Sequence, residues 1–175
     1  ATKVVFPLLE DRIDYNLFKK RYILYCVGLI SRDEFWHGIA AGHEIDHMEQ
    51  RIYVTTKPND DVVELIRELS ASYGLSVASE APSKWGNTLL EQFGVQKCFH
   101  KVFFSSDLGA TKPFKGFYDQ VFSTQDNRAL YIDDTLENLQ AAREYGTQLV
   151  WYGGQKNDEE DIAYASSAAE IRAML

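Results

Sequence analysis

Cysteine and positive charge are scarce in this sequence, and no long apolar run is present. The two cysteines, Cys26 and Cys98, stand far apart without the close spacing of a metal-ligand pair, and we interpret them as reduced thiols of a cytoplasmic protein. The net charge is −8, which argues against nucleic acid or an anionic membrane as a partner. No stretch approaches the roughly 18 apolar residues that span a bilayer, and no signal peptide is visible, so a cytoplasmic location is expected.

The sequence does contain short apolar runs that alternate with helical patterns. A chain of 175 residues, 45% of them apolar, suits one globular domain. Short apolar runs are typical of parallel strands buried on both faces, with helices covering the sheet. We therefore predict an α/β fold with a Rossmann-like parallel sheet flanked by helices, whose first strand lies beside the one that ends at Asp133. The predicted strands are residues 4–9, 75–79, 102–105, 129–133 and 148–152.

Residue types that favour helix ends mark the segments between the strands. Pro82 and Thr135 begin two predicted helices, which end at Gly94 and Gly146 because glycine readily adopts the C-cap conformation. The acidic run 158–161 is interpreted as the start of a further helix, because negative charge is favourable at a helix N-terminus.

Residues 14–51 interrupt this alternation with helical patterns alone. Ser31 and Glu34 have the spacing of a capping box at the start of one of these helices. We predict a core of residues 1–13 and 52–175, with a small helical cap of residues 14–51 inserted after the first strand.

Polar side chains stand where several of these segments end. Ser79 and the pair Asp133 and Asp134 end two apolar runs, and Lys112 precedes Pro113 at a predicted helix start. The carboxyl ends of parallel strands share one edge of a sheet, where α/β proteins bind ligands. A hydroxyl and an ammonium suit a phosphate, whereas two adjacent carboxylates require a hard metal or a lysine. Alternatively, Ser79 and Asp134 only cap the helices that follow them.

In order and spacing, these segments resemble the active-site segments of the haloacid dehalogenase-like hydrolases, in the group with a small helical cap. In that family one aspartate attacks phosphorus, a second aspartate two residues later protonates the leaving group, and magnesium lies between phosphate and carboxylates. The resemblance implies that Ser79 and Lys112 bind phosphate. It also implies that Asp133 and Asp134 are metal ligands, which here would be weak or vestigial.

The first segment lacks the residues that this chemistry needs. Aligned without gaps, Pro7 falls on the nucleophile and Leu9 on the acid/base, and neither side chain carries an oxygen. We therefore predict a catalytically disabled member, a pseudoenzyme, that binds a small phosphorylated ligand or a protein partner. The alternative is an active phosphatase or hydrolase of a small phosphorylated metabolite with Asp11 as nucleophile, although Ile13 then stands where an acid is needed. A third class is a subunit that only scaffolds an assembly.

The loss of both aspartates also affects the expected cofactor. Any magnesium site has lost a carboxylate, and Mg²⁺ dehydrates reluctantly, so we expect no cofactor or weakly bound Mg²⁺. With no nucleophile to neutralise, Lys112 is expected to form an ion pair with Asp133 or Asp134. Removing one member of a partly desolvated pair is costly, so the pair is expected to be structural.

Overall fold

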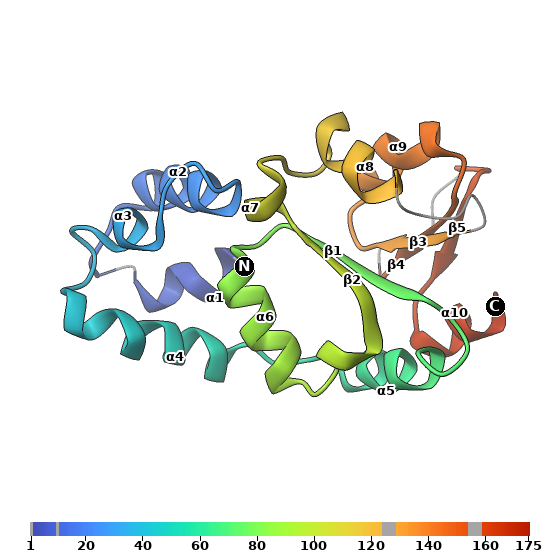
Figure 1. Cartoon of the computed structure of the whole chain (residues 1–175), viewed down its shortest axis with the longest axis horizontal. Helices are drawn as coiled ribbons and strands as arrows, with labels where there is room; N and C mark the ends of the chain where they lie inside the picture. The colour runs from blue at the N-terminus through green and yellow to red at the C-terminus, as the bar shows by residue number, and fades with distance from the viewer. Residues whose placement is uncertain (1, 10, 124–128, 154–158) are drawn as a thin grey trace.

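The computed structural model describes residues 2–9, 11–123, 129–153 and 159–175 (Figure 1). Helices α1 to α4 gather at one end of the molecule, the strands lie at the other, and α6 lies between them. None of the helices in these ranges combines the length and apolarity that crossing a bilayer requires. The elements are α1 (Thr2–Val5), η1 (Phe6–Leu8), α2 (Tyr15–Cys26), α3 (Arg32–Trp36), η2 (Gly42–Glu44), α4 (Ile45–Thr55), α5 (Asp60–Leu69), β1 (Leu75–Ser79), α6 (Ser83–Gln92), η3 (Gln96–Cys98), β2 (Phe99–Phe104), α7 (Ser105–Leu108), α8 (Lys115–Phe122), β3 (Leu130–Asp133), α9 (Leu136–Ala142), η4 (Arg143–Tyr145), β4 (Gln148–Tyr152), β5 (Ile162–Ala165) and α10 (Ala168–Ala173).

The strands form two parallel sheets instead of the single sheet that the sequence predicts. β1 pairs with β2, and Ser79 lies opposite Phe104. β3, β4 and β5 form the second sheet in that order, and Asp133 lies opposite Trp151. Every strand pair in the described ranges is parallel, so the α/β class is confirmed.

Residues 4–9 are helical, and their prediction as the first strand is wrong. They belong to α1, η1 and the turn that follows. Val5 and Leu9, four residues apart, are 2% and 1% exposed, and both pack into the core of the helical part. A short apolar run does not by itself distinguish strand from helix. Pro7 has no N–H to donate to a ladder, so a central strand position was unfavourable for this segment.

Aromatic side chains form the core of the helical part. Phe35 and Trp36 of α3 are fully buried, and Trp85 of α6 packs against both rings. The capping box predicted for Ser31 and Glu34 is confirmed at the start of α3. The helices of residues 14–51 thus pack against a helix that follows β1. The division of the chain after residues 13 and 51 stays a prediction.

Helices cover both faces of the three-stranded sheet. On one face Leu149 of β4 packs with Tyr118 of α8 and Leu139 of α9. On the other face the next residue of β4, Val150, packs with Leu65 of α5. Because successive strand residues face opposite sides, this alternation places β4 between two helical layers.

Two predicted helix ends are confirmed, and one predicted helix start is wrong. Gly94 and Gly146 have φ of +66° and +68°, the left-handed conformation of a glycine C-cap. The acidic run 158–161, whose first residue lies outside the described ranges, leads into β5 and not into a helix. Arg143 contacts the run, with Nη2 at 2.8 Å from Asp161. This ion pairing offsets the negative charge without a helix N-terminus.

Candidate active site at the strand ends

Lys112 lies between the carboxyl ends of β1 and β3. Its Nζ is 2.7 Å from Asp133 Oδ2 and 3.4 Å from the backbone oxygen of Ala78. The lysine and aspartate side chains are 10% and 3% exposed. The ion pair expected between Lys112 and the 133–134 pair is therefore confirmed, and it is buried.

Asp133 accepts four hydrogen bonds, two on each carboxylate oxygen. Oδ2 accepts from Lys112 and from the Tyr131 hydroxyl at 2.8 Å. Oδ1 accepts from the Thr135 N–H at 2.9 Å and from Asn138 Nδ2 at 3.0 Å. Burial acts to raise the pKa of Asp133, but the Lys112 charge and these hydrogen bonds hold it below its ordinary value. Sequence reasoning missed Asn138, a buried amide one turn into the following helix.

This arrangement leaves Asp133 without a lone pair for a magnesium ion. An ionised carboxylate has about four lone-pair sites, and Asp133 uses four for hydrogen bonds. Asp134 is exposed, and its Oδ1 accepts from the Thr135 hydroxyl at 3.3 Å. Within the part of the chain that the structure describes, no three His, Cys, Asp or Glu side chains form a metal cluster. Of the two aspartates that the family resemblance names as metal ligands, Asp134 is therefore the one that keeps lone pairs for a metal.

Ser79 stands at the end of β1, half-buried, next to an exposed carboxylate. That carboxylate, Glu80, accepts a hydrogen bond from the Thr111 hydroxyl in the loop that carries Lys112. Glu80 thus ties the two loops together. It also adds negative charge beside Ser79, which opposes the binding of an anion.

Pro7, Leu9 and Asp11 do not belong to a strand. Pro7 is exposed in η1, Leu9 is buried in the aromatic core, and Asp11 is exposed in the turn before α2. The interpretation that Pro7 and Leu9 occupy the strand positions of a nucleophile and an acid/base is therefore wrong. These residues belong to the helical part of the molecule.

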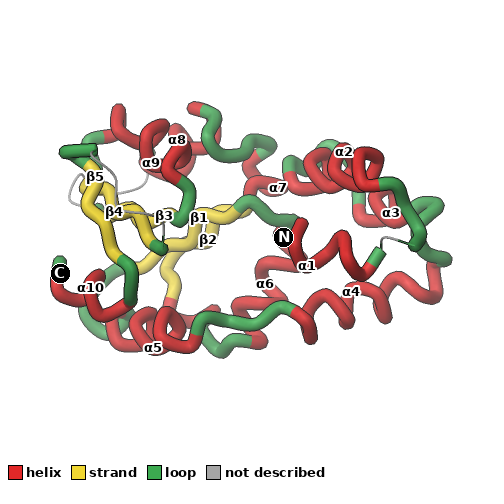
Figure 2. Tube along the Cα trace, turned by 180° about the vertical axis from the view of Figure 1, so that it is seen from behind, coloured by secondary structure: helices red, strands yellow, loops and turns green. Residues whose placement is uncertain are grey.

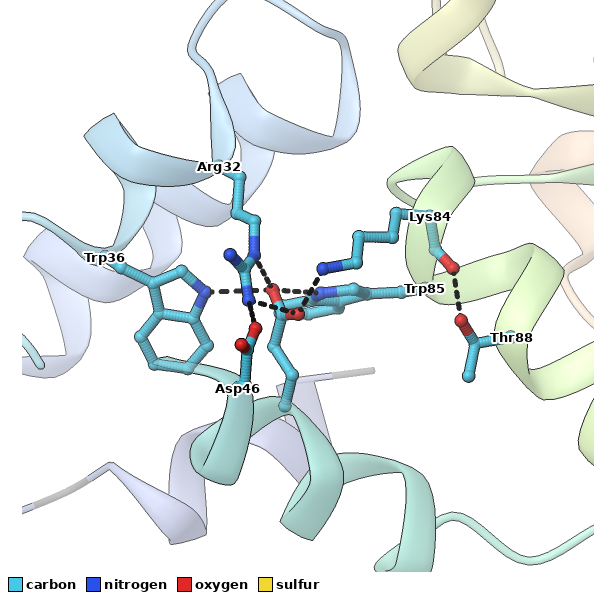
Figure 3. A network of polar contacts seen from close by, with 7 residues as sticks. Arg32, Trp36, Asp46, Lys84, Trp85 and Thr88 are labelled. Atoms are coloured by element: carbon cyan, nitrogen blue, oxygen red, sulfur yellow. Dashed lines mark hydrogen bonds and ion pairs between the residues drawn. The ribbon is translucent and has the colours of Figure 1, made fainter. Parts of the chain in front are cut away.

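A second buried carboxylate lies in the helical part (Figure 3). Glu49 of α4 is 2% exposed. Its Oε1 accepts from the Arg32 Nε at 2.7 Å and from the indole N–H groups of Trp36 and Trp85 at 3.1 and 3.0 Å. Its Oε2 accepts from Arg32 Nη2 at 2.9 Å and Lys84 Nζ at 3.0 Å. The network therefore joins α3, α4 and α6.

The charge of Glu49 is stabilised by these donors. Burial acts to raise its pKa, but the hydrogen bonds from Arg32, Trp85 and Lys84 lower it to about 2. Arg32 also contacts Asp46 on the same helix as Glu49. Sequence reasoning missed this network, since the partners of Glu49 are 13 to 36 residues away and show no spacing motif.

The described residues form an α/β protein with parallel strands and a helical part that precedes them in the chain. A family model described as haloacid dehalogenase-like hydrolase matches residues 8–152. The chain therefore belongs to the haloacid dehalogenase-like hydrolase family. The match leaves out Pro7 and includes Leu9.

Solved structures of this family share the fold at low identity. The HAD-hydrolase YfnB from Bacillus subtilis, bound to magnesium, has a TM-score of 0.69 and 18% identity, with 99% of this chain and 90% of that chain covered. A HAD phosphatase from Thermococcus onnurineus has a TM-score of 0.70 and 16% identity, covering 98% and 88%. A variant of the enzyme bt-2542 from Bacteroides thetaiotaomicron, in complex with magnesium and inorganic phosphate, has 0.69 and 17%, covering 91% and 90%.

Proposed function

We propose that this chain is a catalytically disabled member of the family that binds a small phosphorylated ligand or a protein partner. The observation that supports this most is the state of Asp133. The resemblance makes Asp133 a metal ligand, and its lone pairs accept hydrogen bonds instead. A phosphatase of this family without a firmly held metal would lack the cation between phosphate and carboxylates.

Any phosphate bound at the strand ends should be held weakly, because most of the charges there are negative. Lys112 would have to exchange its contact with Asp133 for a phosphate oxygen. The surrounding carboxylates of Asp133, Asp134 and Glu80 oppose a second anion. Ser79 and Lys112 could hold a phosphorylated ligand only if its other contacts offset this repulsion, or if a protein partner covers the site instead.

A phosphatase assay tests the proposal that the protein is catalytically disabled. The purified chain is incubated with millimolar magnesium and a panel of phosphomonoesters. We expect no turnover above the buffer rate, because the lone pairs of Asp133 accept hydrogen bonds and leave magnesium weakly held. Turnover of about 1 s⁻¹ or more, within the usual enzyme range, contradicts the proposal. If Asp11→Asn then abolishes that turnover, the alternative nucleophile is correct.

Magnesium binding is measured in parallel by calorimetry. We propose that this chain binds Mg²⁺ weakly, through Asp134 and water, because Asp133 is already saturated with donors. Titration of the wild type and of Asp134→Asn separates this site from others. A tight isotherm that Asp134→Asn removes would identify a functional metal centre and overturn the weak-binding proposal.

A further inference from the structure

Apolar side chains lie on both sides of α2. Phe18, Tyr22 and Tyr25 pack into the aromatic core. Away from this core, Leu17 is 46% exposed and Ile23 is 49% exposed. A helix that is apolar all round is ordinarily buried on every side. In the part of the chain that the structure describes, the outer side of α2 has no such cover.

Lys20 lies at the centre of this outer side. Residues three and four apart are neighbours on a helix, so Leu17, Ile23 and Leu24 surround Lys20. The stem of a lysine is itself apolar, and only its ammonium group needs water. The outer side therefore combines an apolar surface with a central positive charge.

The end of α2 brings one more apolar side chain to this surface. Gly28 has φ of +70°, and the N–H groups of Gly28 and Leu29 donate to the backbone oxygens of Tyr25 and Leu24 at 3.1 and 2.9 Å. These two hydrogen bonds form a Schellman motif, in which the residue after the glycine commonly packs beside the residue that accepts its hydrogen bond. Leu29 is 71% exposed, so it extends the apolar surface beyond Leu24. Together these side chains form what we call the outer face of α2: Leu17, Lys20, Ile23, Leu24 and Leu29.

α2 is also positively charged in an acidic protein. Lys19, Lys20 and Arg21 follow one another and the helix contains no acid, whereas the chain has a net charge of −8. Arg21 donates a hydrogen bond to the backbone oxygen of His37. Lys19 and Lys20 are exposed, and neither is paired with a carboxylate of the described residues. Asp14, the acid just before the helix, caps its N-terminus. The two lysines are therefore available to the carboxylates of a partner.

The charges select the kind of partner. Lys19 and Lys20 lie near the middle of α2, so the outer faces of two copies packed antiparallel would set like charges against each other. An anionic membrane would be repelled by the acidic remainder of the protein. A helix with one apolar stripe and carboxylates beside it would cover the leucines and pair with the lysines.

We propose that the outer face of α2 binds an acidic amphipathic helix of another protein. Apolar side chains of that helix pack on Leu17, Ile23 and Leu24, and its carboxylates pair with Lys19 and Lys20. In Figures 1 and 2 α2 lies at the outside of the helical part. The inference specifies a surface for the protein partner in the proposed function, but it does not depend on the strand ends. Its failure would leave the expected absence of phosphatase activity unchanged.

Binding of a designed peptide tests the proposal. The probe is a labelled helix of about 18 residues, or about five turns, with leucine at every third or fourth position, glutamate on both sides of that stripe and alanine elsewhere. Fluorescence anisotropy should show saturable binding to the full chain. The affinity should fall about tenfold when salt rises from about 50 to about 300 mM, because salt screens exposed charges. A peptide with lysine in place of glutamate should not bind. No binding of the glutamate peptide at millimolar concentration overturns the proposal.

Substitutions make the test specific to the outer face of α2. The double variant Lys19→Glu and Lys20→Glu should abolish binding of the glutamate peptide and create binding of the lysine peptide. Ile23→Ser should weaken binding of the glutamate peptide several-fold, because it removes an apolar contact. The double variant Arg51→Glu and Val54→Ser changes an exposed base and an exposed apolar residue of α4, so it is the matched control and should bind like the wild type.

Three other outcomes would overturn the proposal. The first is binding of the glutamate peptide that survives the reversal of both lysines. The second is self-association in sedimentation that Lys20→Glu removes, which would assign the face to a second copy. The third is cosedimentation with phosphatidylserine vesicles that the reversal removes, which would assign the face to a membrane.

Discussion

Glu49 and Asp133 are both buried carboxylates with lowered pKa, but they are held in different ways. Three of the four donors to Asp133 come from its own neighbourhood, within five residues along the chain. All donors to Glu49 come from helices α3 and α6, at least 13 residues away. One network is local to a strand end, whereas the other joins three helices.

This difference predicts which carboxylate supports the fold more. Replacing the Glu49 carboxylate by an amide would leave some of the Arg32, Lys84, Trp36 and Trp85 donors without an acceptor. Removing Lys112 would leave Asp133 with three of its four donors. Uncompensated buried polar groups carry the larger free-energy cost. The helical network should therefore be the more sensitive of the two to substitution.

The largest effect is expected for Glu49→Gln. The neutral amide offers one oxygen and turns its NH₂ group toward the donors, so the free energy of unfolding should fall by about 3 kcal/mol. Urea denaturation measures this loss. Asp46→Asn is the control, because its side chain is 86% exposed yet contacts the same Arg32, and it should cost less than about 0.5 kcal/mol. Equal losses of unfolding free energy for the two variants would mean that the burial of Glu49 does not make it more important for stability than the exposed Asp46.

A smaller effect is expected for Lys112→Met. Asp133 keeps Tyr131, Thr135 and Asn138 as donors, so we expect a loss of about 2 kcal/mol in the free energy of unfolding, without any change in phosphatase rate. Lys115→Met, which breaks an exposed pair with Asp119, should leave the free energy of unfolding nearly unchanged.

The Lys112 result also bears on magnesium. An unchanged melting temperature for Lys112→Met, together with tight magnesium binding by the wild type, would show that the ion pair is not structural. The strand ends would then be a working metal centre. A loss larger than that of Glu49→Gln would reverse the ranking of the two networks.

The two strands and the ion pair at the strand ends could be predicted from the sequence. Apolar runs that end in Ser79 and Asp133 predicted two strands in their observed positions, because such runs stop where the chain leaves the core. The pairing of Lys112 followed from the cost of two adjacent carboxylates without a cation. The structure contains both the two strands and the Lys112–Asp133 ion pair.

The rest depended on contacts between distant residues. The residues around Glu49 in the sequence are typical of an exposed helix position. Glu49 is buried because α3 and α6 pack against α4. The short apolar run of residues 4–9 does not by its pattern distinguish strand from helix, and the structure shows Val5 and Leu9 packed at helical spacing into the aromatic core. β5 has four residues, so its apolar pattern is short. The acidic run before it predicted a helix at this place instead. Tertiary packing decided each case.

The smallest effect expected is a difference in the acid dependence of stability. The pKa of Glu49 is about 2 in the folded protein and about 4.5 ordinarily, so its charge stabilises the fold above pH 4.5. That stabilisation is lost as pH falls from 4.5 toward 2, because the unfolded chain binds the proton first. The gap in unfolding free energy between wild type and Glu49→Gln should therefore be widest above pH 4.5 and narrow steadily below it.

Asp133→Asn provides the matched comparison for this acid dependence. Its ordinary pKa is lower, 3.8, and the folded value is lower still, so its gap should begin to narrow only below about pH 3.8. Urea denaturation at half-unit steps of pH for the three proteins resolves the two windows. A Glu49→Gln gap that stays constant from pH 6 to the acid limit would mean that shape, and not charge, explains its stabilisation. The two carboxylates would then differ in packing alone.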